Sequence, residues 1–145
     1  MTTVVITPEL IASDSKITMN RSGSQLDTMY RSPKIISKKG AILATCGDTE
    51  LGVLFYQWWG TRRKKPEFPE KADFEAVVLD KNGKLWHYDE TLTPAEILEP
   101  FFSIGTGAHA ALGALHAGAS PEQAVEIACK IDNNSGLPVQ IIKRC

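Results

Sequence analysis

Short blocks of hydrophobic residues, separated by polar and turn-forming residues, predict β-strands near the start of this chain. Residues 2–6 are all β-branched and the last three are apolar, Thr-Pro-Glu at 7–9 is a turn signal, and residues 10–13 are mainly apolar again. Runs of this length with turn residues between them are typical of paired strands. We therefore expect a hairpin whose open end places Asp14 beside Thr2.

Two more hairpins are predicted by the same pattern. Residues 33–37 and 41–45 flank a Lys-Lys-Gly turn at 38–40. Residues 74–79 and 84–88 flank Asp-Lys-Asn-Gly, where Asn-Gly favours the positive φ angles of a tight turn. Two shorter apolar segments, 101–104 and 138–143, predict single strands.

Three segments have the spacing and the end signals of helices. The first has Asp48 or Thr49 as its N-cap and ends at Gly60. Its apolar side chains recur three and four residues apart, which predicts a buried stripe. The stripe consists of Leu51, Leu54, Phe55 and Trp58.

The other two helices lie in the C-terminal half. Gly105-Thr106-Gly107 opens a helix rich in small residues that runs to about His116. Ser120 is followed by a proline and an acidic first turn, so a helix is expected from Pro121 to about Ile131. Residues 20–29 are polar and Gly-containing, which predicts an exposed loop. The whole order predicts antiparallel sheets covered by helices, in one domain spanning residues 1–145.

Composition narrows the function classes. The 43% hydrophobic content is enough for one packed core, and the net charge of -1 gives no long-range attraction to nucleic acid or to an anionic membrane. No apolar run approaches the roughly 20 residues of a membrane span, and no secretion signal is present, which indicates a cytoplasmic protein. Three cysteines without metal-ligand spacing indicate reduced thiols. Neither a metal nor a cofactor is expected.

Three local motifs admit a second interpretation. The basic run 62–65 beside Trp58 and Trp59 could bind nucleic acid, although a solvated loop explains it too. Gly105-Thr106-Gly107 lacks the Lys-Ser/Thr ending of a phosphate-binding loop. The two histidines of the same helix, seven residues apart, have no carboxylate or cysteine cluster beside them, so they do not predict a metal site.

The start of the chain carries the sharpest chemical hypothesis. If Met1 is removed, Thr2 becomes an N-terminal residue that holds a hydroxyl nucleophile and a free α-amine. Such an amine has a pKa of about 7.7–8.0, so it is neutral often enough near pH 7 to accept the hydroxyl proton. A strand that happens to begin with threonine is the alternative.

Read together, successive blocks of the chain resemble the proteasome β-type or HslV-type N-terminal threonine peptidases, closest to the short proteasome-like proteins of bacteria and their phages. The resemblance follows the chain in order over almost its whole length, which makes it more specific than any single motif. The blocks are residues 2–5, 11–18, 34–36, 46–48, 104–108, 111–114 and 117–125, and the set Asp132, Ser135 and Gly136.

The resemblance implies a role for individual residues. Thr2 is the nucleophile, and its amine is the general base. Lys34 lowers the proton affinity of the nucleophile, and Asp14 holds Lys34. The Gly47 backbone N–H stabilises the oxyanion. The residues expected to orient the amine and its water are Thr106, Asp132 and Ser135, and those expected to face the specificity pocket are Thr45 and Thr49.

The resemblance also implies a four-layer αββα sandwich of two antiparallel sheets, the N-terminal nucleophile hydrolase fold, in the α+β class. It implies hydrolysis of peptide bonds in polypeptide substrates, a homo-oligomeric ring, and an ATP-dependent unfoldase as partner. A catalytically inactive protein with this fold and a structural or binding role is the alternative, and a nucleic-acid-binding domain is a third.

Several features depart from that family's pattern. Thr106 stands where the family usually has Ser, which keeps a hydroxyl. The segment between Thr2 and Asp14 is short, and the loop between Asp14 and Lys34 is long. The helix expected after Gly60 is missing, and the chain is shorter than most of its relatives.

Overall fold

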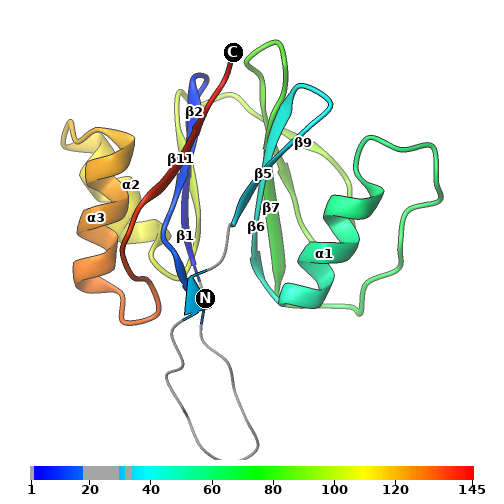
Figure 1. The fold of residues 1–145 in the computed structure, drawn as a ribbon, viewed down its shortest axis with the longest axis horizontal. Helices are drawn as coiled ribbons and strands as arrows, with labels where there is room; N and C mark the ends of the chain where they lie inside the picture. Colours follow the sequence, from blue (N-terminus) through cyan, green and yellow to red (C-terminus); the bar gives the residue numbers. More distant parts are fainter. Residues whose placement is uncertain (1, 18–29, 32–33) are drawn as a thin grey trace, which may run out of the picture.

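The computed structural model describes residues 2–17, 30–31 and 34–145 and shows four layers. Two antiparallel sheets face each other, α1 covers the outer face of one, and α2 and α3 cover the outer face of the other (Figure 1). The predicted α+β sandwich is thus confirmed. The loop expected at 20–29 lies outside the described residues.

The first sheet has four strands in the order β10-β1-β2-β11. Its centre is the predicted N-terminal hairpin, in which Val4 pairs with Ser13 and Ile6 pairs with Ile11. This register continues to Asp14, whose backbone N–H donates to the Thr3 carbonyl oxygen at 3.1 Å. The strands are β1 (Thr3–Ile6), β2 (Leu10–Ser13), β10 (Phe102–Gly105) and β11 (Gln140–Lys143).

The second sheet has five strands in the order β5-β6-β7-β8-β9. Both hairpins predicted for this region are confirmed by the pairing of β5 with β6 and of β7 with β8. A separate pair consists of β3 (Lys16–Ile17) and β4 (Tyr30–Arg31). The strands of the large sheet are β5 (Ile35–Lys38), β6 (Ala41–Gly47), β7 (Phe74–Leu79), β8 (Leu85–Tyr88) and β9 (Ala95–Ile97).

Two of the three helices begin where their capping residues predict, and the other begins at Ala108, after the Gly105-Thr106-Gly107 segment rather than within it. In α1 (Thr49–Trp58) the Asp48 side chain accepts a hydrogen bond from the Glu50 backbone N–H. The helix α2 (Ala108–His116) follows the Gly105–Gly107 segment without a side-chain cap. In α3 (Pro121–Ile131) Ser120 and Gln123 form a complete capping box.

Three apolar clusters hold the layers together. One lies between the two sheets and includes Val4, Ile42 and Val77. A second joins α1 to the five-stranded sheet around Phe55, and a third joins α2 and α3 to the four-stranded sheet around Val5. The inner strands are therefore buried on both faces, which explains their continuous apolar runs.

Four details differ from the sequence-based expectation. Leu54 is 42% exposed rather than buried, because Gly52 and Phe55 form the closest contact of α1 with the sheet. In the 80–83 loop only Gly83 has a positive φ, since the Asp80 carboxylate, accepting from the Asn82 and Lys84 backbone N–H groups, shapes the turn. The edge strand β9 was not predicted. The strand expected at 138–143 begins only at Gln140.

The outer layer over the five-stranded sheet contains α1 alone in the described ranges, which agrees with the absence of a helix signal after Gly60 in the sequence. Residues 59–73 are all described, and they form turns and irregular backbone rather than a second helix beside α1. No helix in the described ranges is both long enough and apolar enough to span a bilayer.

Candidate functional site

The fold brings Thr2, Asp14 and Lys34 together at the end of the N-terminal hairpin. The Lys34 Nζ atom lies 2.9 Å from the Thr2 hydroxyl oxygen and 2.9 Å from Asp14 Oδ1. It also donates to the backbone carbonyl oxygen of Lys16. All three of these atoms are oxygens, which suit a lysine ammonium group because it can only donate.

The Asp14 carboxylate is fixed from several directions. Its Oδ1 atom accepts from the Thr3 backbone N–H at 3.0 Å, in addition to Lys34. Its Oδ2 atom accepts from the Lys16 backbone N–H at 3.1 Å and the Gly136 backbone N–H at 3.0 Å. Because backbone donors hold both oxygens, the carboxylate cannot turn away from Lys34 without breaking several bonds.

These groups are removed from water. Asp14 is fully buried, Thr2 is 6% exposed and Lys34 is 8% exposed. Burial lowers the pKa of Lys34 below its ordinary value, against the opposing attraction of the Asp14 carboxylate. The lysine is therefore held close to the hydroxyl and loses its proton more readily than a surface lysine does.

A network of hydrogen-bonded hydroxyl groups begins at Thr3, the residue after Thr2, and ends on the Asp132 carboxylate. Thr106 Oγ1 donates to Asp132 Oδ2 at 2.6 Å, and Ser135 Oγ donates to the same oxygen at 2.7 Å. Since the single Ser135 hydroxyl proton is used there, the Thr3 hydroxyl is the donor in its 2.7 Å contact with Ser135. Burial raises the pKa of Asp132, but the hydrogen bonds to its carboxylate outweigh this and hold it below its usual value.

Thr2 lines a cavity of about 230 Å³. Gly47, at the end of β6, is on its wall with φ +94°, and a Cβ there would lie 2.1 Å from the Asp73 carbonyl oxygen. Gly105, at the end of β10, also lines the cavity with φ +97°, and a Cβ there would lie 1.8 Å from the Thr2 carbonyl oxygen. Glycine at both positions is needed to keep these backbones close.

Part of the cavity wall was not anticipated from the sequence. Cys46, Asp73 and Glu75 line it together with the predicted residues Thr2, Gly47 and Thr106. Burial, followed by the charges of Glu75 and Asp73, raises the pKa of Cys46 to about 12, so this thiol stays protonated at neutral pH. No sequence motif marks these acids. The strand pairing of Cys46 with Glu75 places them here.

The two residues expected to face a specificity pocket, Thr45 and Thr49, are not part of the wall of this cavity. Successive side chains of a strand point to opposite faces, so Thr45 faces α1 while Cys46 faces the space between the sheets. A Cβ on Gly52 of α1 would lie 2.7 Å from Thr45 Oγ1. Thr49 is an exposed residue in the first turn of α1. Neither residue lines the cavity beside Thr2.

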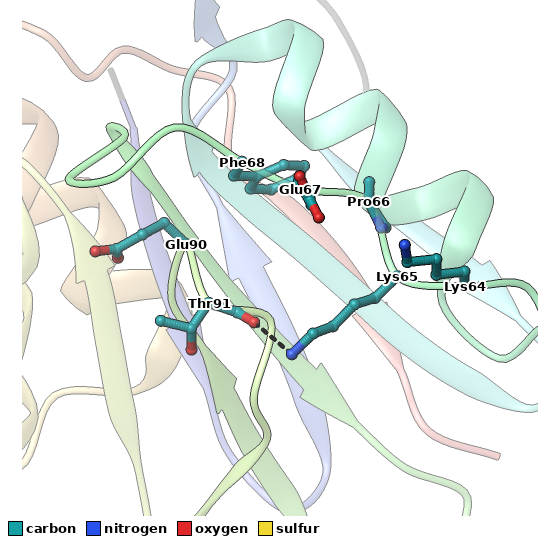
Figure 2. Close-up of a pocket in the computed structure, with 7 residues that line it drawn as sticks. All are labelled: Lys64, Lys65, Pro66, Glu67, Phe68, Glu90 and Thr91. Carbon is teal, nitrogen blue, oxygen red and sulfur yellow. Dashed lines mark hydrogen bonds between the residues drawn. The ribbon is translucent and has the colours of Figure 1, made fainter.

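A second cavity, of about 340 Å³, lies away from this group. Figure 2 shows the Lys65 side chain reaching toward Thr91, whose carbonyl oxygen accepts from Lys65 Nζ at 3.0 Å. Lysines and glutamates dominate the lining, which holds no histidine or cysteine. Its one hydroxyl, that of Thr91, donates to the Asp89 carboxylate at 2.5 Å in an exposed turn. The Thr2 hydroxyl instead contacts a buried lysine paired with a buried aspartate, so we place the chemistry at Thr2 despite the smaller volume of its cavity.

The basic loop makes structural contacts with its neighbours. Trp58 Nε1 donates to the Arg63 carbonyl oxygen at 3.1 Å, and Trp59 Nε1 donates to the Tyr88 hydroxyl at 3.2 Å. Both indoles also pack against the core under α1. The two tryptophans are therefore used in packing against α1 and its neighbours. Across the described ranges, no three His, Cys, Asp or Glu side chains cluster as metal ligands would.

Comparison with known proteins identifies the fold. No protein-family model and no curated protein sequence matched the chain. Among solved structures, Thiobacillus denitrificans BPH in complex with epoxomicin superposes with a TM-score of 0.67 at 17% identity, covering 99% of this chain and 98% of that chain. The structure of T. denitrificans BPH without a named ligand gives 0.66 at 16% identity, with 99% and 98% covered.

Eukaryotic HslV from Trypanosoma brucei superposes with a TM-score of 0.63 at 15% identity, covering 98% of each chain. Because the matched lengths are almost complete in all three, the likeness includes both sheets and the helices on either side. The chain thus has the HslV/proteasome-type N-terminal nucleophile hydrolase fold.

Proposed function

We propose that the chain is an N-terminal threonine peptidase, with Thr2 as nucleophile once it is the first residue of the mature protein. One observation carries the proposal: the Thr2 hydroxyl lies 2.9 Å from a buried lysine that is itself paired with a buried aspartate. A surface threonine at a strand end would not need such surroundings, since two buried charges are costly to maintain without a use for them.

In the proposed reaction the Thr2 hydroxyl proton moves to the Thr2 α-amine as the hydroxyl oxygen bonds to the acyl carbon of the substrate. The Lys34 ammonium favours the developing negative charge on this oxygen. The acyl oxygen becomes an oxyanion beside Gly47, whose backbone N–H we assign as its donor. The amine proton then passes to the leaving nitrogen as the peptide bond breaks, and water hydrolyses the threonine ester.

Three further residues support the amine. Thr106, Asp132 and Ser135 form a connected set of hydroxyl and carboxylate groups next to the cavity. We assign to them the orientation of the α-amine and of the water that resolves the ester. Thr106 keeps the hydroxyl bond to Asp132 that this role requires, so a threonine is accommodated in place of a serine.

The substrate class and the assembly are proposed with the function. Peptide bonds of a polypeptide fit a nucleophile that lines an open cavity, and the fold is shared with BPH and HslV. We propose a homo-oligomer that works with an ATP-dependent unfoldase. Val53 and Leu54 are 48% and 42% exposed on α1, which gives this face apolar area for a neighbouring subunit. Light scattering of the purified chain tests the assembly.

The decisive experiment combines the intact mass with peptide hydrolysis. We expect active protein to have lost Met1, Thr2→Ala to be inactive, and Thr2→Ser to keep part of the activity because it keeps the hydroxyl and the amine. Thr91→Ala is the matched control, since this threonine lies in the second cavity. Hydrolysis by protein that retains Met1, or by Thr2→Ala, would overturn the proposal.

A binding measurement separates a competent site from the inactive alternative. Epoxomicin is present in the BPH structure, so we propose that it also binds here. We expect epoxomicin to raise the melting temperature of the chain with Thr2 at its N-terminus, and to have no effect on Thr2→Ala. An inactive protein with a purely structural role predicts no shift for either protein.

A further inference from the structure

Both polar groups of the Lys34 backbone are held by side chains from distant parts of the chain. The Lys34 N–H donates to the Gln140 side-chain oxygen at 3.0 Å. The Lys34 carbonyl oxygen accepts from the Tyr56 hydroxyl at 3.0 Å. Gln140 belongs to β11 of the four-stranded sheet, and Tyr56 belongs to α1 on the outer face of the other sheet. Lys34 is therefore tied to two layers at once, just before β5 begins.

Each of these two side chains is held in turn. The Gln140 amide nitrogen donates to Ser15 Oγ at 2.8 Å, and Ser15 Oγ donates to the Pro138 carbonyl oxygen at 2.5 Å. This network fixes which end of the Gln140 amide faces Lys34, because only the oxygen accepts from an N–H.

Tyr56 is oriented in a similar way. The Thr45 hydroxyl donates to the Tyr56 oxygen at 3.3 Å, so the phenol proton is directed to Lys34. Burial raises the pKa of Tyr56, which keeps the hydroxyl protonated and able to donate throughout the neutral range. The face of β6 that carries Thr45 is thereby connected to the Lys34 backbone rather than to the cavity beside Thr2.

We propose that Tyr56 and Gln140 are positioning residues that clamp the Lys34 backbone so that its ammonium reaches Thr2 and Asp14 together. This inference rests on the proposed function, in which Lys34 acts on the Thr2 hydroxyl. A lysine side chain is long and flexible, so its Nζ atom is placed well only if the backbone that carries it is fixed. Tyr56 and Gln140 are hydrogen-bonded to the Lys34 backbone and not to Thr2, so both would act on Thr2 through Lys34.

The test removes one side of the clamp at a time. Tyr56→Phe deletes the hydroxyl and keeps the ring, and Gln140→Met keeps the side-chain length and deletes the amide. Tyr88→Phe is the matched control. It deletes the hydroxyl of another tyrosine in the same core under α1, whose partner is Trp59 Nε1 rather than Lys34.

Two measurements are made on each variant. Peptide hydrolysis gives kcat and KM, and NMR titration of lysine labelled with ¹³C at Cε gives the pKa of Lys34, identified by the signal missing from Lys34→Arg. We expect Tyr56→Phe and Gln140→Met to lower kcat about three- to tenfold, as loss of one hydrogen bond does, with KM nearly unchanged. Because burial is the main cause of the low Lys34 pKa, loosening the clamp should raise that pKa toward its ordinary value.

The outcomes separate this inference from the proposed function. A Lys34 pKa that stays at the wild-type value in both Tyr56→Phe and Gln140→Met would overturn the clamp, and so would an equal change in Tyr88→Phe. Wild-type protein without peptidase activity would contradict the proposed function instead. In that case the NMR titration still decides whether Tyr56 and Gln140 hold Lys34.

Discussion

Asp14 and Lys34 form an ion pair at 2.9 Å in which the aspartate side chain is 0% exposed and the lysine side chain is 7% exposed. Asp14 follows β2 in one sheet, and Lys34 precedes β5 in the other, so the pair also joins the two sheets. The ion pair is thus expected to contribute both to the stability of the fold and to the proposed activity.

Removing one partner of this pair should destabilise the protein strongly. Asp14→Ala leaves a buried lysine without its counter-charge and three backbone N–H groups without their acceptor. We expect the free energy of unfolding to fall by about 3–5 kcal/mol, measured by urea denaturation. Activity should be lost under native conditions as well.

The matched control is an exposed pair on the five-stranded sheet. Lys84 Nζ and Glu96 Oε1 lie 3.9 Å apart with 57% and 37% of their side chains exposed. Glu96→Ala should change the free energy of unfolding by less than about 1 kcal/mol, because solvent screens such pairs. Equal effects of Asp14→Ala and Glu96→Ala would contradict the structural role assigned to Asp14.

Gly105 offers a test of the close packing around the candidate nucleophile. A Cβ at this position would lie 1.8 Å from the Thr2 carbonyl oxygen, at a φ of +97°. Gly118 has nearly the same φ, +98°, but a Cβ there would meet nothing within 4 Å. The two alanine variants therefore share the backbone strain, and only Gly105→Ala adds a collision.

We expect Gly118→Ala to cost about 1–2 kcal/mol of stability from the left-handed backbone alone. Gly105→Ala should cost about 1–3 kcal/mol more, because β1 must move away from β10. Thermal unfolding and peptide hydrolysis measured on both variants check this. Full activity in Gly105→Ala would show that the position of Thr2 tolerates the shift, contrary to the proposed site.

Local signals in the sequence were sufficient for most of the fold. The Ser120 capping box and Pro121 fixed the start of α3, and short apolar runs between turn residues identified the paired strands. These features depend on neighbours a few residues apart, which a single sequence displays. The edge strand β9 has exposed side chains and little apolar pattern, so nothing local marked it.

In the candidate site, too, local signals predicted some residues, and others depend on contacts between distant parts of the chain. Asp14 was placed beside the first strand by hairpin register alone, but its association with Lys34 spans 20 residues and came only from the family resemblance. Tyr56 and Gln140 carried no signal, because their role depends on two layers meeting at the Lys34 backbone. The direction of Thr45 toward α1 likewise required the packing of Gly52.

The three thiols should differ in reactivity. Burial and the neighbouring acids raise the pKa of Cys46 to about 12, and burial raises that of Cys129 to about 11, whereas Cys145 is exposed at the C-terminus. At pH 7.5 the thiolate fraction of Cys46 is on the order of 10⁻⁵ to 10⁻⁴. We expect one fast-reacting thiol in native protein and three in urea, measured with a chromogenic disulfide reagent.

Cys145→Ser is the control for this titration, and it should abolish the fast phase without changing the free energy of unfolding. A fast phase that persists in Cys145→Ser would mean that Cys46 or Cys129 is more accessible than the structure shows. Peptide hydrolysis should stay unchanged after the fast phase, because Cys46, which lines the cavity beside Thr2, is left unmodified.

The pH dependence of kcat/KM should report on two groups of the free enzyme. On the acid side the Thr2 α-amine must lose a proton before it can accept one, so activity should rise with an apparent pKa of about 7.7–8.0. On the alkaline side Lys34 loses its proton and with it the ammonium that favours the Thr2 oxyanion. An ordinary lysine has a pKa of about 10.4. Because burial lowers the pKa of Lys34, the alkaline fall in activity should be centred below that value.

Lys34→Arg distinguishes this origin of the alkaline limb from others. An arginine keeps its charge above pH 12, so the variant should lose the alkaline fall while its maximal activity is reduced by the altered geometry. The acid limb should stay where it is, because the α-amine is unchanged. An alkaline limb at the same pH in Lys34→Arg would assign that limb to another group and contradict the role of the Lys34 ammonium.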